Sequence, residues 1–158
     1  MHNANMKRVD SATRIILKPP SSIYQAFMDP KALVSWLPPE GMVGELEEFQ
    51  AFEGGKYKMA LTYIETNYTA GKTSDNVDVV QAKFLKLIKD KQIVQQIEFE
   101  SDDPSFAGKM SMSWNLRVVP GGSEVTVICE NVPEGIQQDA HEEGLNSTLA
   151  NLDAFLGR

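Results

Sequence analysis

The fold is decided by one stretch near the end of the chain, EGIQQDAHEEGLNSTLANLDAFL, residues 134–156. Projected at about 100° per residue, this stretch has one apolar and one polar face, which predicts a long amphipathic helix. A helix with such an apolar side needs a large complementary surface, and only the upstream strands can supply one. We therefore expect a curved sheet that grips this helix, with a pocket between the two. The apolar face carries Ala140, Gly144, Leu145, Thr148, Leu149, Leu152, Phe155 and Leu156.

Two residues on this helix need an explanation. His141 falls near the middle of the apolar face, where a titratable ring could hydrogen-bond a ligand or act as an acid or base near neutral pH. The alternative is a core histidine satisfied by a hydroxyl, a backbone carbonyl or Glu98. Gly144 costs about 1 kcal/mol relative to alanine in mid-helix. Its presence indicates either close packing against a neighbour, which we favour, or room for a ligand.

The chain before this helix reads as strands with one helical interruption. Asp29-Pro30 separates two short helices that precede Pro38-Pro39, and Gly54-Gly55 is a hairpin signal. Consecutive strands joined by hairpins imply an antiparallel sheet, so the expected class is α+β. We expect a flexible N-terminus at residues 1–8 and a single domain at residues 9–158. The expected strands are Val9–Leu17, Val43–Phe52, Lys56–Tyr63, Val77–Ile88, Gln92–Phe99, Lys109–Val118 and Glu124–Val132.

Alternating apolar residues indicate which side chains face the inside of the sheet. On one strand Met110, Met112, Trp114, Leu116 and Val118 are expected to point inward, and on another Tyr57, Met59 and Tyr63. Methionine adapts to irregular shapes and tyrosine brings a polar tip, so an adaptable pocket is one interpretation. An ordinary filled core is the other. The predicted ligand-contacting residues are His141, Trp114, Met112, Tyr57, Met59, Tyr63, Phe99, Trp36 and Leu145, with Trp36 at a gate.

Composition excludes several classes of function. The chain has 158 residues, 42% of them hydrophobic, which suits one globular domain. Its formal charge of -7 and pI of about 4.8 argue against nucleic acid or an anionic membrane as the main partner. No run of about 18 apolar residues could span a membrane. The single cysteine, Cys129, and the absence of a signal-like N-terminus favour a cytoplasmic protein.

No pattern for a metal or a cofactor is found in the sequence. The two histidines are His2 and His141, too few for an ordinary zinc site. Cys129 has no histidine at a spacing that argues for a nucleophile and is expected to be an inert buried thiol. Phosphate loops, dinucleotide glycine patterns and nucleophile elbows are also missing. We therefore expect neither a metal nor a cofactor, and we assign no catalytic residue.

The order of elements resembles the START-like (SRPBCC) superfamily, and within it the branch of heat-shock-chaperone ATPase activator homologues. Three segments carry the resemblance and together span nearly the whole chain. They are Pro20 to Pro38 with its Asp29-Pro30 and Trp36, Phe52-Glu53-Gly54-Gly55-Lys56-Tyr57, and Val132-Pro133-Glu134-Gly135 followed by Gly144-Leu145 through Leu156. Two positions depart from the family pattern: Leu145 replaces a usual tryptophan, and Cys129 replaces a frequent histidine. The lining of the cavity should therefore differ from that of relatives.

The resemblance implies a helix-grip fold, in which a strongly bent antiparallel sheet surrounds a C-terminal helix. It also implies our first hypothesis, binding of a small apolar molecule between sheet and helix. The second hypothesis is an enzyme of the cyclase or hydratase type with His141 as general acid or base. The third is a protein-interaction module without a ligand, akin to a chaperone cofactor. A homodimer is allowed by the resemblance alone.

Overall fold

The computed structural model of the chain describes residues 8–64 and 76–157. The N-terminal segment expected to be flexible, residues 1–8, lies outside this range apart from Arg8. Most of the loop expected after Tyr63 lies outside it as well.

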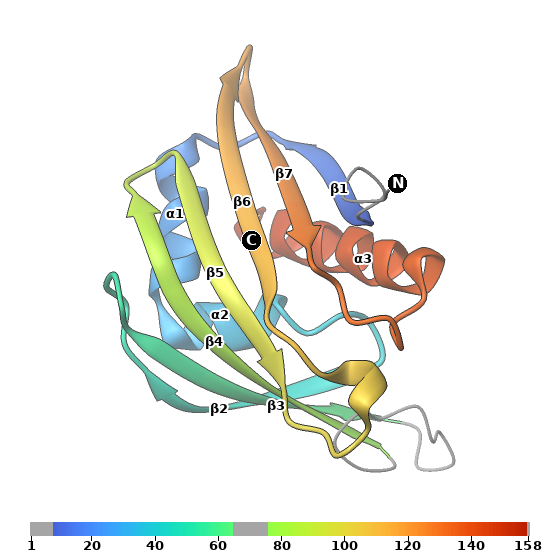
Figure 1. Cartoon of the computed structure of the whole chain (residues 1–158). Helices are drawn as coiled ribbons and strands as arrows, with labels where there is room; N and C mark the ends of the chain where they lie inside the picture. The colour runs from blue at the N-terminus through green and yellow to red at the C-terminus, as the bar shows by residue number, and fades with distance from the viewer. Residues whose placement is uncertain (1–7, 65–75, 158) are drawn as a thin grey trace, which may run out of the picture.

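Seven antiparallel strands form one sheet in the order β1-β7-β6-β5-β4-β3-β2 (Figure 1). Neighbours in sequence are neighbours in the sheet from β2 to β7, as hairpin connections require, and β1 joins beside β7. The strands are β1 Val9–Ile16, β2 Met42–Phe49, β3 Lys56–Tyr63, β4 Val77–Ile88, β5 Gln92–Phe99, β6 Met110–Val119 and β7 Gly122–Glu130. The helices are α1 Pro20–Met28, α2 Pro30–Trp36 and α3 Gln138–Leu156, with a short 3-10 helix at Pro104–Phe106.

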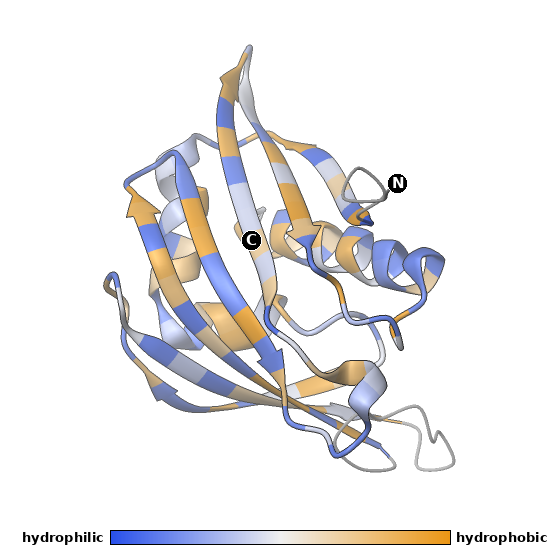
Figure 2. Ribbon diagram, viewed as in Figure 1, coloured by the Kyte–Doolittle hydropathy of each residue, from blue (hydrophilic) through white to orange (hydrophobic). Residues whose placement is uncertain are grey.

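The sheet curves around the three helices, which lie on its concave side (Figure 1). Apolar and polar residues alternate along the strands, as expected where one face is buried and the other is wet (Figure 2). The α+β helix-grip architecture predicted from the sequence is therefore confirmed.

The core is filled by large side chains from the helices and the sheet. Phe27 of α1, Trp36 of α2 and Trp114 of β6 form an edge-to-face cluster, with ring centroids 4.8, 5.0 and 6.0 Å apart. Both tryptophans are fully buried, and so are Leu149 and Leu152 of α3. The apolar face predicted for the terminal helix is thus the packed face from Leu145 to Leu152, whereas Ala140, predicted on the same face, is exposed.

Three details differ from the sequence prediction. Val118, expected to point inward, is 73% exposed, because the β6–β7 hairpin projects beyond the helices that cover the rest of the sheet (Figure 1). Helix α3 begins at Gln138 rather than near Glu134, because Gly135 lies tightly against Ser105 and its N–H donates to the Ser105 carbonyl. Gly144 is not explained by close packing, since a Cβ there would meet nothing within 4 Å.

The two edge strands of the sheet, β1 and β2, have different surroundings. Helix α3 runs beside β1, where the Ser11 N–H donates to Glu142 at 3.0 Å and Gln138 donates to the Val9 carbonyl at 3.1 Å. The outer strand at the opposite edge, β2, exposes Glu45, and further along Glu47 and Glu48. Charged side chains on an edge strand oppose pairing with another chain, so the acidic edge of β2 is protected without a covering helix.

Candidate functional site

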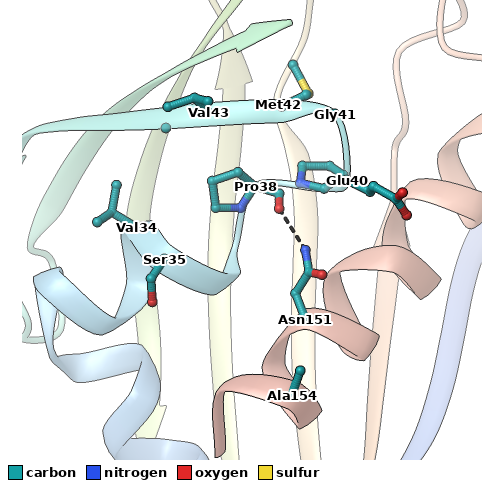
Figure 3. A pocket seen from close by; sticks show the side chains of 11 residues that line it. Val34, Ser35, Pro38, Glu40, Gly41, Met42, Val43, Asn151 and Ala154 are labelled. Carbon is teal, nitrogen blue, oxygen red and sulfur yellow. Dashed lines mark hydrogen bonds between the residues drawn. The ribbon is translucent and has the colours of Figure 1, made fainter. Parts of the chain in front are cut away.

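A hollow of about 340 Å³ lies where α2, the beginning of β2 and the second half of α3 meet (Figure 3). Its walls come from three segments that are distant in sequence. The lining residues are Val34, Ser35, Pro38, Pro39, Glu40, Gly41, Met42, Val43, Gly44, Asn151 and Ala154.

The loop between α2 and β2 forms one wall, and side chains of α3 hold it in place. Thr148 donates to the Leu37 carbonyl at 3.0 Å, and Asn151 donates to the Pro38 carbonyl at 2.9 Å (Figure 3). The Ser147 hydroxyl accepts from the Glu40 N–H at 2.9 Å. These side chains satisfy two backbone carbonyls and one backbone N–H of the loop. The wall is therefore fixed to the helix at three points.

Apolar side chains line the hollow from several sides, although more of its exposed surface is polar than apolar. Val34 of α2, Pro38 of the loop and Ala154 of α3 face the hollow from three sides, and Met42 and Val43 add the start of β2. Gly44 is required for close approach, because a Cβ there would lie 2.8 Å from Pro38 Cγ. Sites for small molecules combine apolar walls with a few polar groups, and here Ser35, Glu40 and Asn151 supply polar side chains.

The ligand-contacting residues predicted from the sequence are not among those that line this hollow. Trp36, Trp114, Tyr57, Met59 and Leu145 are buried in the core at 5% exposure or less. Met112, Tyr63 and Phe99 are partly buried. Met59 lies beside one lining residue, since its sulfur would be 3.3 Å from a Cβ on Gly44. Of the predicted set, the structure brings Trp114 and Trp36 into contact through the aromatic cluster and leaves His141 apart from them.

Three predicted or neighbouring residues form a buried polar chain. Trp114 donates its ring N–H to Gln95 at 3.2 Å, and Gln95 donates to the Tyr57 hydroxyl at 3.1 Å. Burial raises the pKa of Tyr57 to about 12, although the hydrogen bond from Gln95 opposes the shift. Gln95 therefore hydrogen-bonds the polar atoms of both aromatic side chains, the Trp114 ring N–H and the Tyr57 hydroxyl.

His141 contacts a carboxylate rather than any of the partners expected for it. Its Nδ1 lies 2.7 Å from Oδ2 of Asp10 on β1, and Arg8 donates twice to the same carboxylate at 2.7 Å. Burial alone would raise the pKa of Asp10, which is fully buried, but the hydrogen bonds from Arg8 and His141 outweigh it and lower that pKa overall. Glu98, suggested as a partner of His141, is exposed on the outer face of the sheet.

Sequence reasoning missed Asp10, although a signal was present. Asp10 occupies an inward position of a strand whose inward neighbours Ala12 and Ile16 are apolar. A charged residue in that phase needs a buried partner. Its cross-strand neighbour Cys129 is fully buried, and burial together with the charge of Asp10 raises the pKa of the thiol to about 12. Such a thiol is a poor nucleophile, in keeping with the inert role expected for it.

The remaining chemistry can be stated for the residues that the structure describes. Among these residues no group of three or more His, Cys, Asp and Glu side chains is placed to hold a metal ion. None of the helices in the described ranges is long and apolar enough to cross a membrane. The Asp10–His141 pair offers an acid–base couple, but neither residue lines the hollow.

The bent seven-stranded sheet, the two helices after β1 and the packed terminal helix define a helix-grip protein of the START-like (SRPBCC) type. The sequence profile described as "Activator of Hsp90 ATPase homolog 1-like protein" matches residues 18–157. The chain belongs to this family, whose members generally bind hydrophobic ligands or act as chaperone cofactors.

Solved structures of bacterial proteins share the fold over nearly the whole chain. A protein of Chromobacterium violaceum is 27% identical, with a TM-score of 0.83 over 95% of this chain and 97% of that one. A Staphylococcus epidermidis protein is 21% identical, with a TM-score of 0.75 over 96% of this chain and 90% of that one. An Arthrobacter aurescens protein is 16% identical, with a TM-score of 0.79 over 99% of this chain and 90% of that one. A search of curated protein sequences found no match.

Proposed function

We propose that the protein binds a small, largely apolar molecule in the hollow between α2, β2 and α3. The observation that carries this proposal is the hollow itself, about 340 Å³ in volume, with Val34, Pro38 and Ala154 on three sides. This volume is within the range of sites for small organic molecules, about 300–1,000 Å³. Burial of apolar surface drives binding, and Asn151 supplies a polar group that orients the molecule. A reducing cytoplasm, in which Cys129 stays a thiol, is the compartment that we propose.

The position of the hollow sharpens the original expectation of a pocket between sheet and helix. Aromatic side chains fill the centre of the molecule, so the ligand lies at the border of the sheet rather than deep inside it. In this arrangement Trp36 stabilises the predicted gate at α2, because its ring N–H donates to the Ala26 carbonyl at 3.0 Å and joins α2 to α1. The predicted residues Trp36 and Met59 then act on the ligand through the walls that they support.

A neutral apolar dye, N-phenyl-1-naphthylamine, tests the proposal by its fluorescence on binding. Ala154→Trp fills the hollow from an exposed position of α3 and should weaken dye binding about tenfold or more, as the loss of about 1.4 kcal/mol implies. Ala140→Trp is the matched control, an exposed alanine of the same helix outside the hollow, and should leave binding unchanged. Native mass spectrometry of the freshly purified protein would search for a natural ligand in parallel. Equal dye binding by both variants, or neither dye binding nor a co-purifying molecule, would refute the proposal.

The filled interior favours a second candidate, a chaperone cofactor that works through its surface. The family description names an activator of the Hsp90 ATPase, and tightly packed aromatic rings leave the core no role in ligand binding. Measuring ATP hydrolysis by an Hsp90 with and without this protein separates the candidates. Stimulation that persists in Ala154→Trp supports the cofactor role, and no stimulation removes it.

A further inference from the structure

A second hollow, of about 450 Å³, lies over β3, β4 and β5, on the face whose residues alternate with the buried ones. Four lysines line it, together with two glutamines and two glutamates, so its formal charge is positive although the whole chain carries -7. Such a local reversal of charge favours an anion. The lining residues are Glu48, Lys56, Tyr57, Lys58, Gln81, Ala82, Lys83, Gln96, Glu98 and Lys109.

The register of the strands places two of these lysines in direct opposition. Lys56 of β3 and Lys83 of β4 are cross-strand partners on the same outer face. Like charges that face each other across a ladder destabilise a sheet. Neither lysine forms an ion pair with a carboxylate in the described ranges. An anion between the two ammonium groups would relieve this repulsion.

The same face already shows how a carboxylate is held. Lys58 and Gln81 are cross-strand partners, and Glu100 lies 2.8 Å from the Lys58 ammonium and 2.8 Å from the Gln81 amide nitrogen. Hydrogen bonds from Lys58 and Gln81 lower the pKa of Glu100, so its carboxylate stays charged. A lysine and a glutamine side by side on this sheet are therefore a carboxylate-binding pair.

The same pairing of a lysine with a glutamine occurs between the next two strands, β4 and β5. Lys83 of β4 and Gln96 of β5 are cross-strand partners, as Lys58 and Gln81 are, and both line the hollow. Lys56 stands opposite Lys83 and adds a second ammonium group, and Lys109 adds another at the rim. The repeat gives a carboxylate group one amide donor and two ammonium groups.

We propose that the hollow over β3, β4 and β5 binds a small organic anion with two or more carboxylates, held by Lys56, Lys83 and Gln96. One carboxylate lies between Lys83 and Gln96, in the way that Glu100 lies between Lys58 and Gln81. A second carboxylate reaches Lys109. The site is separate from the apolar hollow at α2 and α3, so either proposal can fail without the other.

Citrate is the probe, titrated at low ionic strength and followed by amide chemical shifts and by calorimetry. The double variant Lys56→Gln/Lys83→Gln should weaken citrate binding about tenfold, since it removes both ammonium groups beside the bound carboxylate. The control Lys86→Gln/Lys89→Gln removes the same charge from exposed lysines of the β4–β5 hairpin that do not line the hollow. The control should bind citrate as the unmodified protein does.

Two outcomes would overturn the proposal. Equal weakening in both double variants would mean that citrate responds to net charge alone. No binding at millimolar citrate, with no shift of the Lys83 and Gln96 amides, would mean that the lysines are only a solvated face. A titration with inorganic phosphate distinguishes the ligand class, because binding of phosphate with equal strength would contradict a site built for spaced carboxylates.

Discussion

Replacing His141 by leucine should destabilise the fold by about 2 kcal/mol. The substitution removes the Nδ1 contact to Asp10 at 2.7 Å and leaves a fully buried carboxylate with Arg8 as its remaining partner. Hydrogen bonds to charged groups contribute about 1.5–3 kcal/mol, and the His141 side chain is only 15% exposed, so solvent weakens the contact little. For a domain of this size the melting temperature should fall by about 4–8 °C.

Urea unfolding, followed by fluorescence of the buried tryptophans, measures this loss. A double-mutant cycle with Asp10→Leu isolates the pair, because the variant that lacks both partners leaves no buried charge between β1 and α3. Arg8 is 26% exposed and can turn to water when Asp10 is removed. The double variant should therefore cost about 1–2 kcal/mol less than the sum of the two single changes.

The control is Glu143→Leu, which changes an exposed charge on the same helix and should stay within about 0.5 kcal/mol. A loss below about 0.5 kcal/mol in His141→Leu, or strict additivity in the cycle, would refute the view that this ion pair fastens α3 to β1. That result would favour the ligand-binding role predicted for His141.

Four further predictions test other features. The pKa of Asp10 is lowered in the folded protein, so the stability it adds is present above its ordinary value of 3.8 and is lost as the pH falls from there through the lowered pKa of the folded state. Acid unfolding should accordingly show the difference between the unmodified protein and Asp10→Asn shrinking below about pH 5. Tyr57→Phe should cost about 1–2 kcal/mol in urea, because Gln95 loses its buried partner. Gly144→Ala should raise stability by about 1 kcal/mol, since the added methyl group meets no neighbour. Cys129, with its pKa raised to about 12, should resist Ellman's reagent at pH 8 until urea unfolds the chain; rapid labelling of the native protein would contradict its burial.

Most of the architecture could be predicted because the signals for it are local. The apolar stripe of residues 134–156, the alternation of β3 and β6, and the Gly54-Gly55 turn each lie within one element and its neighbours. Boundaries moved where tertiary contacts decide them, as at Gly135, whose fit against Ser105 delays the start of α3.

The site was harder to predict, because it depends on which elements meet in space. The contact of His141 with Asp10 joins residues 131 positions apart, and helix periodicity gives no information on how the helix is rotated against β1. The residue type of the two large tryptophans suggested that they line a pocket. Trp36 and Trp114 are the kind of residues that line pockets, but here they pack on Phe27 and close the space. The hollow instead uses Pro38, Gly44 and Asn151, whose types carry no distinctive signal in the sequence.

The acidic border of β2 limits how this protein can assemble. Two copies that joined their β2 strands in antiparallel fashion would bring Glu45, Glu47 and Glu48 of one close to the same carboxylates of the other. Repulsion between them opposes a continuous intermolecular sheet. Any homodimer should therefore use another surface, and growth of fibrils through β2 is opposed by the same carboxylates.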